Sequence, residues 1–151
     1  MSILKEFRYQ VSAEWRGGPA VKMQAPGKPD LEIVTPPEFR GGVAGVWSPE
    51  DLLLGAAASC YALTIGAVAE HLGVKLLGLD VRGTGHLVKR DNGRFGFVAI
   101  ELTVDMTTEA EQALSAENVA ARAREICIVT LALDVPIHVD VAVHAPAVLV
   151  A

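Results

Sequence analysis

Alternation between apolar and polar residues is the main structural signal in this chain. From Phe7 to Trp15 every second residue is apolar, which predicts a half-buried β-strand. Two short apolar runs follow it, separated by a Pro-Gly-Lys-Pro-Asp turn. Two longer alternating runs are joined by an Asp-Asn-Gly sequence that is typical of a hairpin turn. The predicted strands lie at residues 7–15, 21–25, 31–34, 77–88, 95–106 and 137–143.

One segment, residues 52–69, is apolar on all sides and carries no charge. Ser48 is a suitable N-cap and Pro49 a suitable first helical residue, so we predict a helix that ends near Leu72, before Gly73. The segment reaches the lower limit of transmembrane length. However, it consists largely of Ala and Gly, and acidic residues flank it rather than Lys or Arg. We therefore interpret it as a central buried helix and expect no membrane partner.

A second helix is expected between the last two strands. Thr108 and the glutamate three residues later have the spacing of a capping box, which would start a helix running towards Ile126. Val119, Ala123 and Cys127 recur at intervals of four residues, so we expect them on its buried face.

The predicted order of elements is βββ-α-ββ-α-β, which indicates an α+β fold in a single domain, residues 1–151. A 51% hydrophobic composition is sufficient for a substantial core. The net charge of −5 and the lack of Lys/Arg runs argue against a nucleic-acid partner. The N-terminal residues lack an apolar signal core, so a cytoplasmic location is expected.

Two cysteines carry the candidate chemistry. Cys60 lies within the uncharged segment and Cys127 at the end of the second predicted helix. Neither has the spacing of a zinc site, so no metal is expected. Both could be inert core residues, because free cysteine is among the most buried residue types. Alternatively, they could be a pair of reactive thiols.

The sequence around Cys60 resembles a known family. The run Ser-Pro-Glu-Asp-Leu-Leu at 48–53, followed by Ala-Ala-Ala-Ser-Cys60, is similar to the OsmC/Ohr family of osmotically induced and organic hydroperoxide resistance proteins. The second cysteine before a final strand and the order of elements also match. The resemblance covers nearly the whole chain. It implies an OsmC-like fold and an intertwined homodimer with a central buried helix and sites at the interface.

The resemblance also implies a thiol peroxidase of the cytoplasm that acts on organic hydroperoxides in oxidative-stress defence. Cys60 would attack the peroxide and become a sulfenic acid, and Cys127 would then form a disulfide with it. Arg40 and Glu50 match the family's arginine and glutamate, since a guanidinium can stabilise a thiolate and a carboxylate can hold the guanidinium. The implied reductant is an external thiol or dithiol, with no other cofactor. A relative that binds small apolar ligands or protects against stress without turnover is the alternative.

Helix geometry gives an independent argument for a second copy. Glu50 precedes Cys60 by ten residues on one predicted helix, which is a rise of about 15 Å and an angular offset of about 80°. An antiparallel partner helix could place the Glu50 of one chain beside the Cys60 of the other.

Two assignments stay open at this level. Arg16, in a Trp-Arg-Gly-Gly sequence, is a rival to Arg40 as the catalytic arginine. In the family a proline usually follows the second cysteine, whereas Ile128 follows Cys127 here. Without proline we expect no built-in helix break at this cysteine, and its resolving role is less well founded than the role of Cys60.

Overall fold

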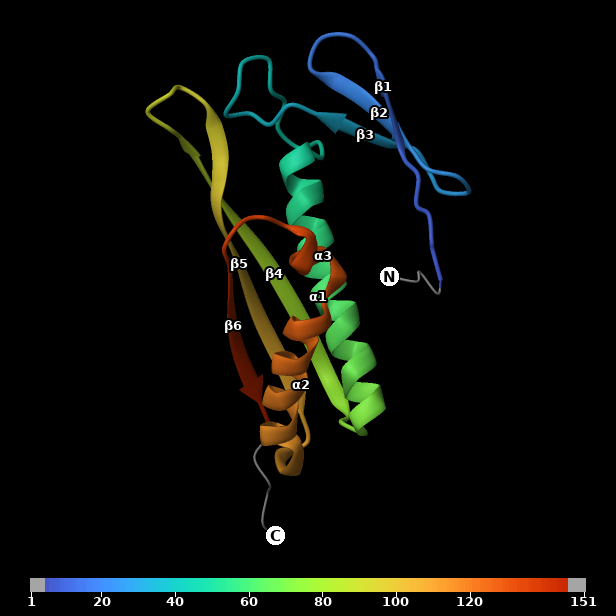
Figure 1. Ribbon diagram of the computed structural model, residues 1–151, viewed down its shortest axis with the longest axis vertical. Helices are drawn as coiled ribbons and strands as arrows, with labels where there is room; N and C mark the ends of the chain where they lie inside the picture. The colour runs from blue at the N-terminus through green and yellow to red at the C-terminus, as the bar shows by residue number, and fades with distance from the viewer. Residues whose placement is uncertain (1–4, 147–151) are drawn as a thin grey trace. The chain divides into compact units, whose positions relative to one another are not determined.

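The computed structural model describes residues 5–146 and divides into two compact units, one up to Leu52 and the other from Leu53 onwards. The α+β class and the order of strands and helices agree with the prediction, with one short additional helix (Figure 1). The elements are β1 (Ser12–Trp15), β2 (Ala20–Gln24), β3 (Leu31–Val34), α1 (Pro49–Leu72), β4 (Leu76–Lys89), β5 (Phe95–Thr108), the 3-10 turn η1 (Ala110–Gln112), α2 (Ala113–Ile126), α3 (Ile128–Ala132) and β6 (Ile137–His144).

The N-terminal unit is a small antiparallel sheet in the order β1-β2-β3. Its buried apolar side chains are Ile33 and Val34 of β3. The predicted half-buried strand at 7–15 is wrong in extent, because only its last four residues pair with β2, and it is wrong in burial too. Tyr9, for example, is 90% exposed. The alternation is present, but no described residue of this unit covers its apolar side.

Helix α1 has the predicted ends. The Ser48 hydroxyl accepts a hydrogen bond from the Asp51 N–H, and the Asp51 carboxylate accepts one from the Ser48 N–H, which satisfies two donors at the helix start. Gly73 follows the last helical residue with a φ of +67°, a conformation that favours glycine.

One face of α1 is buried within the chain and the opposite face is open. Tyr61 and Ile65 belong to the core, whereas Leu63 is 76% exposed. Only 22% of the most apolar 18-residue window of the helix is buried. The helix is long and apolar enough to cross a membrane by length and composition alone, a test that the core helix of a soluble protein also passes. The described residues of the C-terminal unit leave this face exposed.

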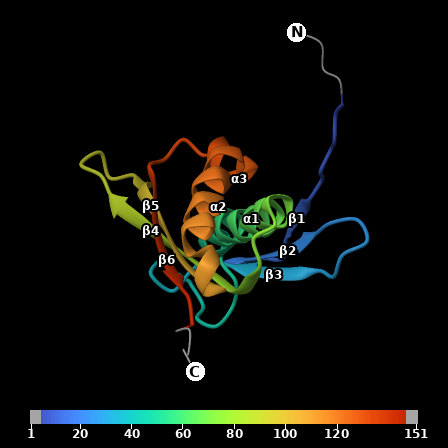
Figure 2. The ribbon, with the colours of Figure 1, turned by 90° about the horizontal axis from the view of Figure 1, so that it is seen from below.

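The C-terminal unit contains the larger core. Its sheet has the order β4-β5-β6, in which β5 pairs antiparallel with β4 and parallel with β6. Helices α1 and α2 both cover one face of this sheet (Figures 1 and 2). Alternate residues of β5 point into the core, while the residues between them are polar. The most deeply buried apolar residues of β5 are Ile100, Leu102, Val104 and Met106.

The predicted capping box at Thr108 is wrong. Thr108 is the last residue of β5 and is fully buried, and its hydroxyl donates to the Glu109 carbonyl instead of capping a helix. A short 3-10 turn follows, and α2 begins only at Ala113. The buried stripe of α2 is confirmed, since Val119 and Ala123 are fully buried.

Tyr61 provides a test of the packing between the two main helices. Its side chain is 1% exposed, and its hydroxyl donates to the Ala120 carbonyl at 2.7 Å. Tyr61→Phe should lower the free energy of unfolding by about 1 kcal/mol, because a buried hydrogen bond is lost and little volume changes. Urea denaturation followed by circular dichroism measures this loss. Tyr9→Phe, at an exposed position, is the matched control, and an equal effect of both variants would contradict the contact.

Candidate functional site

Both cysteines lie in the C-terminal unit, and the fold brings them together. Cys127 is fully buried in the core, and Cys60, halfway along α1, packs against the same core and is partly exposed. The Cys60 thiol is near enough to Cys127 to contribute to lowering the pKa of the Cys127 thiol. Both are free thiols in this structure. The two residues are 67 positions apart in the chain, so their meeting follows from the packing of α1 against the end of α2.

The chain breaks its helical path at Cys127, contrary to the expectation drawn from the missing proline. Helix α2 ends at Ile126, Cys127 has an extended ψ of 105°, and α3 starts at Ile128. Cys127 serves as the N-cap of α3, and its carbonyl accepts the Leu131 N–H at 3.1 Å.

The surroundings of Cys127 favour its thiolate. Burial of the thiol raises its pKa, but hydrogen bonding by the side chain and N–H of Thr130, by Cys60 and by the Val129 N–H outweighs burial. The pKa of Cys127 is therefore below its usual value. The Sγ atom does not close a strict capping hydrogen bond in this state, so these groups act at longer range. A thiolate would draw them closer.

A threonine hydroxyl stands beside the carbonyl of each cysteine. Thr64 donates to the Cys60 carbonyl at 2.7 Å, and Thr130 donates to the Cys127 carbonyl at 3.1 Å. Thr130 also lowers the pKa of the Cys127 thiol. The sequence analysis missed Thr130. Its position three residues after Cys127 carries information only once Cys127 is known to be an N-cap.

Arg40 and Glu50 both lie in the N-terminal unit, and the structure does not join them. Arg40 is exposed, and within residues 5–146 its side chain makes no ion pair or hydrogen bond. Glu50 has one buried carboxylate oxygen, Oε2, without a hydrogen-bond partner among the described residues. A buried carboxylate oxygen is costly unless it is paired, so this atom requires a donor.

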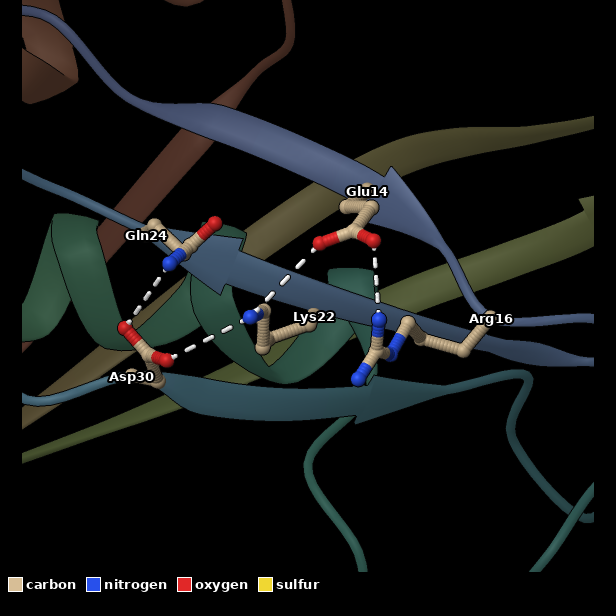
Figure 3. Close-up of polar contacts among 5 residues, drawn as sticks. All are labelled: Glu14, Arg16, Lys22, Gln24 and Asp30. Atoms are coloured by element: carbon tan, nitrogen blue, oxygen red, sulfur yellow. Dashed lines mark hydrogen bonds and ion pairs between the residues drawn. The ribbon is translucent and has the colours of Figure 1, made fainter.

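The rival arginine is engaged elsewhere. Arg16 donates to the Glu14 carboxylate at 2.8 Å, and Lys22 lies between Glu14 and Asp30 (Figure 3). These side chains line one face of the small sheet and are half exposed, so their ion pairs contribute little to stability. In this structure the Arg16 guanidinium is held by a neighbouring carboxylate, whereas that of Arg40 is not.

No group of three or more His, Cys, Asp or Glu residues within 5–146 is arranged to hold a metal ion. A cavity of about 160 Å³ lies beside α3, and its lining includes Tyr61, Arg124 and Thr130. Tyr61 has a raised pKa because of burial and the charge of Cys127, although Arg124 opposes the shift. It remains a neutral phenol at neutral pH.

Comparison with known proteins identifies the family. The model of the family described as OsmC-like protein matches residues 42–142, which is more than half of the chain. The chain belongs to the OsmC-like protein family. A comparison with functionally curated proteins found no match.

Several solved structures share the OsmC-like fold. An OsmC-like protein of unknown function from Vibrio cholerae has a TM-score of 0.79 at 15% identity, with 91% of this chain and 100% of that chain covered. An organic hydroperoxide resistance protein from Elizabethkingia anophelis has a TM-score of 0.75 at 19% identity, covering 95% and 100%. Another from Legionella pneumophila has a TM-score of 0.74 at 23% identity, also covering 95% and 100%. At these identities the likeness establishes the fold.

The two cysteines of this OsmC-like chain differ in accessibility, and alkylation tests this difference. In the native protein at neutral pH we expect iodoacetamide to label Cys60 first, because Cys127 is 0% exposed and must await local unfolding. Peptide mass spectrometry at successive times measures the order. Cys127→Ser should keep the fast reaction and Cys60→Ser should lose it. Equal rates at both sites would show that burial does not protect Cys127.

Proposed function

We propose that this OsmC-like protein is a thiol peroxidase that reduces organic hydroperoxides to alcohols in oxidative-stress defence. The observation that carries the proposal is that a partly exposed Cys60 and a buried Cys127 pack into the same core within one unit. A redox pair needs one thiol that peroxide can reach and a second within bonding reach of the first. Family membership and the fold shared with organic hydroperoxide resistance proteins support the same role.

The proposed cycle uses both thiols in turn. The Cys60 thiolate attacks the outer peroxide oxygen, the O–O bond breaks, and the alkoxide takes a proton to leave as the alcohol. Cys60 becomes a sulfenic acid, and Cys127 then attacks its sulfur to form an intrachain disulfide and water. An external thiol or dithiol reduces the disulfide by exchange. The cytoplasm supplies such thiols, so we assign the activity to that compartment.

Arg40 and Glu50 are proposed as the charged members of the site. We assign to Arg40 the binding of the peroxide oxygens and the stabilisation of the thiolate, and to Glu50 the fixing of Arg40 by a bidentate pair. Two observations support this assignment. The Arg40 guanidinium has no partner within residues 5–146, and the Glu50 carboxylate has a buried oxygen that requires one.

We propose a homodimer as the working form. The open face of α1 is apolar and rich in small residues, so a second copy of this helix can approach it closely and remove it from water. The separation of Glu50 from Cys60 along α1 supports the same arrangement, because an antiparallel partner brings the two types of residue together.

Peroxide consumption tests the function. Wild-type protein with a small dithiol should reduce cumene hydroperoxide faster than hydrogen peroxide in stopped-flow measurements, because apolar surroundings favour an alkyl group. Cys60→Ser should lose the reaction. Cys127→Ser should react once and then stop as a sulfenic acid or overoxidise. If wild-type protein consumes no hydroperoxide and keeps both thiols, the proposal fails and a ligand-binding or protective role without turnover takes its place.

A pair of matched variants tests the arginine. Arg40→Ala should lower kcat/KM for cumene hydroperoxide by about 100-fold, since a positioned donor to the developing oxyanion is lost. Arg16→Ala, which removes a half-exposed arginine paired with Glu14, should have little effect. The reverse result would transfer the role to Arg16 and leave the cysteine mechanism intact.

A further inference from the structure

Cys127 is a thiol that a peroxidase must use as a nucleophile although it is fully buried. Burial in apolar surroundings favours the neutral thiol, and a neutral thiol attacks a sulfenic acid poorly. The local structure counters this effect. Cys127 caps α3, so the first N–H groups of that helix face its side. The Thr130 hydroxyl adds a donor that no other residue type in α3 could supply.

The Thr130 hydroxyl lies beside the backbone of Cys127. It donates to the Cys127 carbonyl at 3.1 Å, and hydrogen bonding by Thr130 lowers the pKa of the Cys127 thiol. The carbonyl already accepts the Leu131 N–H, so it remains satisfied when the hydroxyl turns away.

We propose that Thr130 is a positioning residue for disulfide closure, which turns its hydroxyl to the Cys127 sulfur and holds the thiolate facing Cys60. This inference rests on the proposed function and adds a residue that the family resemblance does not supply. In the step itself the Cys127 thiolate attacks the Cys60 sulfenic sulfur, and the S–S bond forms as the S–O bond breaks. The oxygen leaves as hydroxide, which takes up the proton that the Cys127 thiol released on forming its thiolate, so that water departs. The Cys127 sulfur is oxidised and the Cys60 sulfur is reduced by the same electron pair.

The charged and titratable groups around Cys127 come from the two main helices. From α1 they are Cys60 and Tyr61, and from α2 Arg124, which acts on Tyr61. The raised pKa of Tyr61 keeps its phenol neutral at neutral pH. The rate of closure should therefore follow the thiolate fraction of Cys127, whose pKa is lowered.

Closure can be measured apart from peroxide attack. One equivalent of cumene hydroperoxide oxidises Cys60, and quenched samples are resolved by intact mass into sulfenic acid and disulfide. In Thr130→Val, closure at neutral pH should be about tenfold slower, because loss of the hydroxyl donor raises the pKa of Cys127 and lowers its thiolate fraction. The rate should recover at alkaline pH, and Thr130→Ser should restore the wild-type profile. Thr64→Val removes the equivalent hydroxyl at Cys60 and should leave the pH midpoint of closure unchanged.

A second measurement does not depend on peroxidase activity. In a Cys60→Ser background Cys127 is the sole thiol, and its ultraviolet thiolate absorbance gives its titration midpoint directly. Adding Thr130→Val should raise that midpoint. An unchanged midpoint, or closure slowed equally at every pH, would overturn the role of Thr130. A shifted midpoint in a protein that consumes no hydroperoxide would instead refute the proposed function alone.

Discussion

The packing of α1 against β5 is the contact on which the candidate site depends. Tyr61 and Ile65 belong to the same buried core as the apolar residues of β5. The Tyr61 hydroxyl also donates a hydrogen bond to the backbone of α2. Because Cys60 is the neighbour of Tyr61, this contact fixes the depth and direction of its thiol. The same packing presents Cys60 to the end of α2, where Cys127 closes the core. The two thiols meet because hydrophobic burial places them together.

Residue patterns were sufficient to predict most of the fold. The two long strands and α1 were found within one or two residues, because their periodicity and capping residues agree. The errors have physical causes. At 7–15 apolar and polar residues do alternate, and this pattern shows which side chains would be buried in a half-buried strand. It does not show what would cover them, and in the structure these apolar side chains are exposed. Thr108 has the spacing of a helix cap, but it is buried in the core as the last residue of a strand, so its hydroxyl is not available to cap a helix.

The candidate site divides in a similar way. Cys60 and Cys127 were identified from resemblance to a family, and the fold places both in the same core, but their redox roles stay predictions. The roles of Arg40 and Glu50 also stay predictions, because neither residue meets a partner within the described part of the chain. Thr130 could not be found from spacing alone. Its place depends on the break at Cys127, which no proline or glycine marks in the sequence.

Because Cys127 lies in the connection between β5 and β6, a disulfide to Cys60 would also affect the stability of the fold. Parallel strands require a long connection, and Cys127 lies within it, between α2 and α3. A bond from Cys127 to Cys60 would tie this connection to α1 and close a loop of roughly 70 residues, which in the chain-entropy model restricts the unfolded chain by about 4 kcal/mol. The oxidised protein would thus be a cross-linked chain and the reduced protein an open one. Each redox cycle would then form and break a cross-link in the folded unit. Reduction would regenerate the reactive thiol and would also remove the stabilisation that the disulfide gives against unfolding.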